Sequence, residues 1–312
     1  MLVSQVVGPG RSEVVEVEDL VPGARQVLLE VLACGVCTSD RTAWGEHDVA
    51  GAPTRLGHEV VGRVSGVGVE AARWRIGDVV TGLGGDGFAT AAVFDADSLA
   101  PIPTGIAPEL ALGEPLAVLE EAISRAGIRP GDRVAIVGLG FMGLGLVQLA
   151  ALRLPSLLVG IDPRPGNDAL ALRLGAHEVH RPDALPTEFT TGGLRELRFD
   201  VVIEAAGVTS ALSTSSTIVR PYGTVCVVGY HHSGTAPMDM ELWYKGVTTV
   251  NGFSPHRPRT MRAMRDGLGM IADRTFDYTP LITHRFGLRE VDAAFELMRE
   301  HPASFVKSVI VP

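Results

Sequence analysis

Cysteine and lysine are both scarce in this chain. Of its 312 residues only Cys34, Cys37 and Cys226 are cysteines, too few for a disulfide framework or for a zinc site of four thiolates. Only Lys245 and Lys307 are lysines, and the other basic residues are arginines. The formal net charge of -9 disfavours nucleic acid or an anionic membrane as a partner.

Signals for export and for membrane insertion are also lacking. The N-terminus has no basic region followed by an apolar segment, so we expect a cytoplasmic protein without a membrane partner. Residues 134–152 carry no charge, and a run of that length could in principle span a bilayer. The run contains four glycines and Gln148, however, and it begins like a buried strand of a parallel sheet. A strand followed by a buried helix is therefore the better interpretation.

The order of the expected elements indicates an α/β fold with two domains. Short apolar stretches between glycine and proline signals make the first hundred residues β-rich. From about Glu114 the pattern alternates strand and helix, which is typical of parallel βαβ units in a doubly wound sheet. After about residue 257 a helix, a short strand, a second helix and a final strand follow. The length is enough for roughly two domains.

A glycine pattern predicts a dinucleotide-binding turn. Gly138, Gly140 and Gly143 have the G-x-G-x-x-G spacing directly after an apolar strand and at the start of a helix. The first glycine permits the tight turn, the second lets the backbone approach a pyrophosphate, and the third lets the helix pack on the strand. The residues between them complete the expected contact with the cofactor: Leu139, Phe141 and Met142.

The next expected strand ends at Asp162. An acid at this place suits the ribose 2′-hydroxyl of NAD and repels the 2′-phosphate of NADP, so we expect NAD in preference to NADP. Arg164 opposes this preference, because an arginine can accept the phosphate. Two later strands should also carry residues beside the cofactor, namely Ala205, Gly207 and Gly229.

Three segments carry residues that can bind a metal ion. Cys37 lies in CGVCTSD, His58 and Glu59 lie in GHE, and Glu114 lies in GEPLAV. Thiolate, neutral imidazole and carboxylate are ordinary zinc ligands. The segments are far apart, so spacing alone leaves open that the cysteine is a core residue and that the histidine is only hydrogen-bonded.

Taken together, the motifs resemble the zinc-dependent medium-chain dehydrogenase/reductase superfamily, the alcohol and polyol dehydrogenases. The matching segments follow the family's order along nearly the whole chain: CGVCTSD, LGHEVVGRVSGVG, RIGDVV, EPLAV, VGLGFMG, DVVIEAAG, HRFGLREVDAAFELM and KSVIVP. The resemblance implies a GroES-like, β-rich catalytic domain made of residues 1–118 and 258–312. It also implies an inserted Rossmann nucleotide-binding domain of residues 119–257.

The resemblance further implies a metal site. Cys37, His58 and Glu114 would bind one catalytic zinc ion. A glutamate as the third ligand resembles the sorbitol, glucose and threonine dehydrogenase branch rather than the simple alcohol branch. Glu59 would lie next to the ligands and could transiently replace water.

The segment after the zinc cysteine would supply the proton pathway. Asp40 would orient His58, because ligating histidines usually donate their other N–H to a carboxylate or a carbonyl. Ser39 would pass the proton of the substrate hydroxyl towards solvent. Relatives often have histidine where this chain has Thr42, so the last step of the relay is open, and His47 is a nearby substitute.

Two further features bear on the site. Relatives often carry a four-cysteine lobe with a structural zinc after a GDVV-like strand, but here GDVVTGL runs straight into GGDGFATAAVF. We therefore expect no structural zinc, and we interpret Cys34 and Cys226 as packing residues. The candidates for contact with substrate are Arg41, Trp44 and His47, although Trp44 could equally be an aromatic residue that packs on the domain.

The expected function is a reversible oxidoreductase for a small-molecule alcohol or ketone. A polyol, sugar or amino alcohol is the favoured substrate class, a biosynthetic ketone reduction is equally compatible, and the family suggests a homodimer or a homotetramer. Two alternatives remain open. One is a metal-free medium-chain reductase of quinones or enoyl groups, and the other is a non-catalytic nucleotide-binding protein with the same fold.

Overall fold

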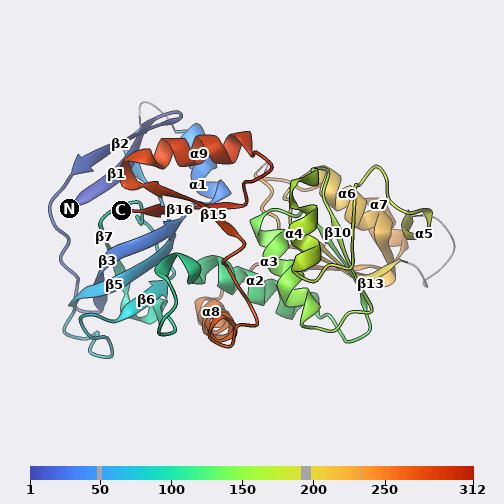
Figure 1. Cartoon of the computed structure of the whole chain (residues 1–312), viewed down its shortest axis with the longest axis horizontal. Coiled ribbons are helices and arrows are strands. Elements are labelled where there is room, and N and C mark those ends of the chain that lie inside the picture. The colour runs from blue at the N-terminus through green and yellow to red at the C-terminus, as the bar shows by residue number, and fades with distance from the viewer. Residues whose placement is uncertain (48–50, 191–197, 233) are drawn as a thin grey trace. The chain divides into compact units, whose positions relative to one another are not determined.

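The computed structural model describes residues 1–47, 51–190, 198–232 and 234–312 (Figure 1). The chain divides into two units. The first consists of Met1–Ala117 and Met261–Pro312, and the second is Val118–Thr260. The second unit is therefore an insertion in the first, and each boundary falls within a helix, α2 (Gly113–Ala126) and α8 (Arg257–Ala272).

The first unit is built mainly on antiparallel strands. Its larger sheet has the order β15-β16-β3-β5-β6-β8, with β7 also paired to β3, and its smaller sheet has the order β2-β1-β4. The strands are β1 (Leu2–Gly8), β2 (Arg11–Glu16), β3 (Gln26–Gly35), β4 (Thr54–Arg55), β5 (Glu59–Val67), β6 (Val79–Gly82), β7 (Ala91–Asp95), β8 (Leu99–Pro101), β15 (Ile282–Gly287) and β16 (Lys307–Val311). The helices are α1 (Thr38–Gly45) and α9 (Val291–Glu300), with the 3-10 turns η1 (Ala96–Ser98), η2 (Pro108–Leu110) and η4 (Leu288–Glu290).

Alternation along β3 explains how this unit forms its core. Val27, Leu29 and Val31 occupy every second position and are buried, because side chains on one face of a strand recur with a period of two. They belong to one apolar cluster with Trp44 and Phe295, which come from α1 and α9. Each such buried side chain contributes roughly 1.5–3 kcal/mol. The core thus fixes the end of β3, from which the first candidate ligand follows.

The second unit is a doubly wound parallel sheet, as the sequence predicted. Its strand order is β11-β10-β9-β12-β13-β14, and every neighbouring pair is parallel. The strands are β9 (Arg133–Val137), β10 (Leu157–Ile161), β11 (Glu178–His180), β12 (Phe199–Glu204), β13 (Val219–Val227) and β14 (Thr248–Asn251). They alternate with α3 (Phe141–Ala151), η3 (Pro165–Asn167), α4 (Asp168–Arg173), α5 (Thr187–Thr190), α6 (Thr209–Ile218) and α7 (Met240–Tyr244). The order of the strands reverses at β9, which is where such sheets bind ligands at their carboxyl edge.

The long uncharged run forms a strand and a helix rather than a membrane span. Residues 133–137 are β9 and residues 141–151 are α3, and most of their side chains are buried. Strands covered on both faces are apolar throughout, which accounts for the absence of charge. In the part of the chain that the structure describes, no helix is both long enough and apolar enough to cross a bilayer.

Candidate metal centre and nucleotide-binding site

The candidate metal ligands are brought together by two paired strands. β3 and β5 run antiparallel, and Gly35 near the end of β3 pairs with Glu59 at the start of β5. Cys37 follows β3 as the N-cap residue of α1, and His58 immediately precedes β5. Because the end of one strand meets the start of the other, the two side chains reach the same edge of the sheet.

Three side chains form a cluster whose chemistry fits a zinc ion. The Cys37 Sγ, a His58 ring nitrogen and a Glu59 carboxylate oxygen all lie within 4.8 Å of one another. Thiolate, imidazole and carboxylate are a usual zinc ligand set. The buried Glu59 Oε2 has no hydrogen-bond partner among the described residues, as expected of an atom that faces a ligand. These residues therefore fit the metal ion that the resemblance implies.

Asp40 ties together the two segments that carry the cluster. Its Oδ1 lies 3.1 Å from His58 Nδ1 and accepts a hydrogen bond from the Gly57 amide at 3.2 Å, while Oδ2 accepts one from the Cys37 amide at 3.4 Å. Burial alone would lower the pKa of His58, but hydrogen bonds to Asp40 and Cys37 outweigh it and raise the pKa to about 12. The raised pKa favours the doubly protonated imidazolium, whereas a ligating imidazole is neutral, so metal binding would release one of the two ring protons.

A buried lysine forms an ion pair with Glu59, the carboxylate of the cluster. The Lys307 Nζ on β16 donates to Glu59 Oε1 at 2.6 Å, and both side chains are almost fully buried. Burial opposes the charge on Lys307, but Glu59 and the other acidic groups raise the pKa of the lysine above its usual value. Gly35 gives the carboxylate room, since a Cβ there would lie 1.9 Å from Glu59 Oε2. Sequence reasoning identified neither Lys307 nor Gly35 as part of the site.

Glu114 lies in the electrostatic field of the cluster without belonging to its ligand group. The carboxylate within ligand distance of Cys37 and His58 is Glu59, whereas Glu114, in the first turn of α2, is outside that group among the described residues. Burial and the charge of Glu59 raise the pKa of Glu114 to about 7. The start of α2 is anchored near β5, because Thr81 accepts a hydrogen bond from the Gly113 amide at 2.9 Å and donates to a β5 carbonyl at 2.8 Å.

The hydroxyl groups that follow Cys37 differ in their partners. The exposed Ser39 Oγ lies 3.3 Å from Cys37 Sγ, so this hydroxyl stands at the cluster and faces solvent. Thr42 Oγ1 instead donates to the Thr38 carbonyl one helical turn earlier, at 3.1 Å. Thr42 is thus bonded within α1, and the last step of the relay stays open.

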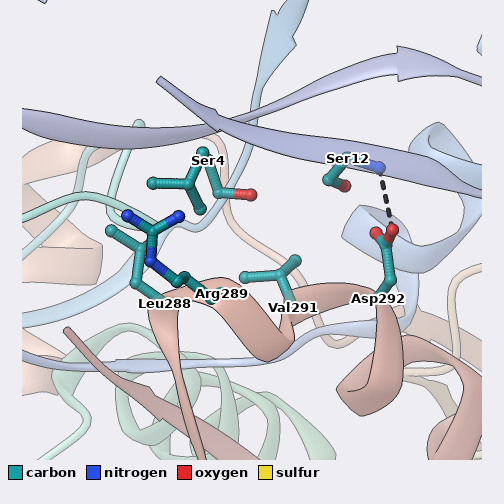
Figure 2. Close-up of a pocket in the computed structure, with 7 residues that line it drawn as sticks. Ser4, Ser12, Leu288, Arg289, Val291 and Asp292 are labelled. Carbon is teal, nitrogen blue, oxygen red and sulfur yellow. Dashed lines mark hydrogen bonds between the residues drawn. The ribbon is translucent and has the colours of Figure 1, made fainter. Parts of the chain in front are cut away.

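Trp44 has a structural role rather than the substrate contact suggested for it. Its indole is 4% exposed and packs on Phe295 with ring centroids 5.2 Å apart. The indole N–H donates to Asp292 on α9 at 2.8 Å, and Asp292 also accepts the Ser12 amide at 2.9 Å (Figure 2). A buried Trp N–H usually finds such a partner.

The glycine turn of the second unit has the shape that its sequence predicts. Gly138 follows β9 with φ of +101°, and a Cβ at Gly143 would lie only 1.7 Å from the Gly138 carbonyl oxygen. Gly140 caps α3, and a Cβ there would meet no atom of another described segment within 4 Å. The first and third glycines are thus required by the fold, whereas the second leaves open space at a helix N-terminus, where a phosphate can bind.

A second loop at the carboxyl edge of this sheet is held by a buried acid. Glu204 ends β12 and accepts the Ala206 and Gly207 amides, both at 2.7 Å. Gly207 has φ of +69°, and a Cβ at Gly229 would lie 2.1 Å from the Gly207 nitrogen. The close approach of these two backbone segments explains why both positions are glycine. The predicted cofactor residue Ala205 lies in the same loop, directly after β12.

Asp162, which was expected to bind the ribose, already accepts hydrogen bonds from groups of the protein. It follows β10 and is 3% exposed. Its Oδ2 accepts the Leu139 amide at 2.8 Å, and its Oδ1 accepts both the Arg164 amide at 2.9 Å and Arg164 Nε at 3.1 Å. Burial alone would raise the pKa of Asp162, but these donors outweigh it and hold the pKa below its usual value. The preference for NAD assumed a carboxylate that is free to bind the ribose.

The comparisons with known proteins match both units. A family model for the alcohol dehydrogenase GroES-like domain matches residues 23–104, and one for zinc-binding dehydrogenases matches residues 142–268. The chain belongs to the medium-chain dehydrogenase/reductase superfamily. Membership makes it an oxidoreductase of the zinc-type alcohol and polyol dehydrogenase class, with the GroES-like and Rossmann folds that the sequence predicted.

Individual members of this superfamily match almost the whole chain. A sorbitol dehydrogenase of Halalkalibacterium halodurans is 26% identical over 98% of this chain and 97% of its own length. An NADP-dependent isopropanol dehydrogenase of Thermoanaerobacter brockii is 28% identical over 95% and 96%, respectively. The solved structure of an alcohol dehydrogenase from Thermus sp. ATN1 has a TM-score of 0.87, with 23% identity and coverage of 100% and 99%. A relative named as NADP-dependent gives no support to the expected preference for NAD.

Two features of this superfamily member escaped sequence reasoning for different reasons. Lys307 pairs with a residue far away in the sequence, although a lysine in an apolar strand of a lysine-poor chain was a usable signal. Asn167 donates to the Leu139 carbonyl at 2.7 Å and so fixes the glycine turn. Its place after Pro165 resembles an ordinary polar turn, and no sequence signal separates it from one.

Proposed function

We propose that this protein is a zinc-dependent oxidoreductase that transfers a hydride reversibly between a small alcohol or its ketone and a nicotinamide cofactor. The observation that supports this proposal is the cluster of Cys37, His58 and Glu59, whose ligand atoms lie within 4.8 Å of one another. The buried carboxyl group of Glu114, whose pKa is raised, interacts electrostatically with this cluster. We keep the ligand set that the resemblance implies for one zinc ion, namely Cys37, His58 and Glu114. Glu59, held by Lys307, is the neighbouring carboxylate.

The residues of the cluster have separate tasks in this mechanism. A bound zinc ion would supply Lewis-acid polarisation of the substrate oxygen, and the nicotinamide would accept or supply the hydride. Asp40 holds His58 through Nδ1, which leaves Nε2 for the metal. The exposed Ser39 hydroxyl accepts the proton of the substrate hydroxyl while it releases its own proton towards water. His47 is the candidate for a final relay group, because Thr42 is bonded within its helix.

The cofactor would be held by backbone groups of the second unit. The turn from Gly138 to Gly143 and the start of α3 bind the pyrophosphate, because unpaired amides at a helix N-terminus attract anions. Ala205, Gly207 and Gly229 lie at the ends of β12 and β13 and line the cofactor at the carboxyl edge.

The proposed substrate class is a polyol, a sugar or an amino alcohol. The assignment of a glutamate ligand supports this class, and a sorbitol dehydrogenase is among the relatives. Arg41 and His47 remain the proposed substrate contacts, and the proposed assembly is a homodimer or a homotetramer. A screen of these alcohols and the corresponding ketones with both nicotinamide cofactors tests the class, and turnover confined to quinones or enoyl compounds would overturn it.

The zinc role is tested by removing the thiolate. Purified protein should contain about one zinc per chain, and Cys37→Ala should lose both the metal and the turnover. Cys226→Ala is the matched control, because this buried cysteine lies on β13 in the other unit and should keep both. Full activity of Cys37→Ala, or of protein stripped with EDTA, would overturn the zinc role.

A further inference from the structure

The carboxylate of Asp162 has no acceptor site left for a ribose hydroxyl. Besides the Leu139 amide and the Arg164 amide, it accepts Nε and Nη2 of the Arg164 side chain at 3.1 and 3.3 Å. An ionised carboxylate has about four acceptor positions, so these four donors fill it. An acid that selects NAD needs a position free for the 2′-hydroxyl.

The ion pair also removes the repulsion by which an acid excludes a phosphate. Arg164 donates to the carboxylate through two nitrogens, and this bidentate geometry places the guanidinium charge next to both oxygens. The pKa of Asp162 is held low, so the carboxylate stays ionised and the pair persists at neutral pH. A phosphate that approaches this strand end therefore meets a balanced pair rather than a lone negative charge.

The outer side of the Arg164 guanidinium is available. Its Nε and Nη2 face Asp162, whereas its Nη1 has no hydrogen-bond or ion-pair partner among the described residues. The Arg164 side chain is 49% exposed. A guanidinium carries five N–H donors in a fixed plane, so Arg164 can keep its contact with Asp162 and still bind a second anion.

A second arginine fixes the backbone that carries this pair. Arg181 directly follows β11, whose last residue His180 is in register with the last residue of β10. Its Nη1 donates to the carbonyl of Asp162 at 2.6 Å and to that of Arg164 at 3.1 Å, and its guanidinium also pairs with Asp168. Two arginines at the carboxyl ends of neighbouring parallel strands thus frame the edge at which the adenosine ribose binds in this fold.

We propose that Asp162 serves as a clamp for Arg164, that Arg164 binds the 2′-phosphate of NADP, and that this chain prefers NADP(H) to NAD(H). Asp162 and Arg181 are positioning residues, and Arg164 is the specificity-determining contact. The inference rests on the proposed function, since it concerns the nicotinamide cofactor of that reaction. It reverses the preference that an acid at the end of β10 suggests from sequence alone.

Calorimetric titration of the full-length, zinc-loaded protein with 2′,5′-ADP and 5′-AMP isolates this contact, because the two ligands differ only in the 2′-phosphate. The wild type should bind 2′,5′-ADP about tenfold or more tightly than 5′-AMP. Arg164→Ala should weaken 2′,5′-ADP about 10–100-fold, as expected for the loss of a charge-assisted pair, and change 5′-AMP less than about threefold. Arg164→Lys should recover only part of the loss, since lysine lacks the planar fork.

Two further variants separate the clamp from other roles. Arg173→Ala removes an exposed arginine at the far end of α4 and should leave both affinities unchanged. Asp162→Asn keeps an acceptor for the Leu139 amide and should change 5′-AMP binding less than about threefold, because Asp162 does not bind the ribose in this account. A tenfold loss of 5′-AMP binding in this variant, with no such loss for 2′-deoxy-5′-AMP, would make Asp162 the ribose acid and would overturn the proposal.

The remaining outcomes distinguish this inference from the proposed function. Equal or weaker binding of 2′,5′-ADP than 5′-AMP by the wild type, or an unchanged ratio in Arg164→Ala, overturns the inference while NADH binding and turnover leave the oxidoreductase function intact. Failure to bind NADH, NADPH and both adenosine phosphates would overturn the inference together with the proposed function.

Discussion

The turn around Gly138 and the cluster around Cys37 are made of different parts of the chain. The turn is formed by backbone groups within one βαβ unit, and its shape depends on glycines that leave space. The cluster is formed by charged side chains from β5, β16 and the residues after β3. One site therefore depends on local backbone geometry, and the other on charges that balance only when distant segments are folded together.

This contrast predicts that removing one buried charge damages the metal site most. Lys307→Met would leave Glu59 buried without its cation, which costs about 3–5 kcal/mol in unfolding free energy. Denaturant unfolding of the metal-free protein measures the loss. The double variant Lys307→Met with Glu59→Gln should recover most of the lost unfolding free energy. If Lys307→Met alone stays within about 1 kcal/mol of the wild type, the ion pair is not needed for stability.

In the nucleotide-binding turn, one added methyl group should cause a comparable loss of stability. Gly143→Ala would place a Cβ against the Gly138 carbonyl, and an overpacked backbone contact of this kind costs about 3 kcal/mol. Gly140→Ala is the matched control, because its Cβ would have open space among the described residues and should cost about 1 kcal/mol or less. Thermal unfolding and NADH titration should show that Gly143→Ala loses stability, whereas Gly140→Ala stays folded but binds NADH more weakly. Equal stability of the two variants would contradict the backbone account.

Substitution of the two glutamates at the metal site tests which of them is the third zinc ligand, and the expected effects are smaller. As a ligand, Glu114 should be needed for zinc, so Glu114→Ala should lower the zinc affinity more than Glu59→Gln does. For Glu59→Gln we expect a loss of about 10–100-fold in affinity or activity, as is usual for partners of ligands. Competition with a chelator measures both. The reverse order would make Glu59 the third ligand, in keeping with its place in the cluster.

The smallest expected effect is at Thr42. Its hydroxyl donates to the Thr38 carbonyl, so Thr42→Val, which keeps the shape of the side chain, should leave kcat within about twofold of the wild type. Ser39→Ala is the contrasting variant and should lower kcat about 100-fold or more, as for a lost proton-transfer group. A large loss of kcat in Thr42→Val would restore this residue to the relay.

The same contrast explains what the sequence could predict. The βαβ order, the strand and helix of residues 133–151 and the glycine turn were predictable because each depends on neighbouring residues. The short helix α1 was not predicted, since only Asp40 and Trp44 on it are buried and its periodicity is weak.

Side-chain partners were much harder to predict. An acid at the end of a strand gives no sign that Arg164 will saturate it, and the use of Trp44 in the core depends on Asp292 and Phe295 near the other end of the chain. Pairing of this kind is decided by the tertiary fold, which a motif does not describe. The ligand set Cys37, His58 and Glu114 that the resemblance implies stays a prediction, and the pairing of Glu59 with Lys307 is visible only in three dimensions.

X-ray absorption at the zinc edge of the purified protein shows whether Cys37 ligates a zinc ion. We expect about one zinc per chain with a single sulfur ligand at about 2.3 Å and nitrogen or oxygen ligands at about 2.0–2.2 Å, and little or no zinc in purified Cys37→Ala. A protein that is active without zinc, or a zinc ion without a sulfur ligand, would contradict this expectation.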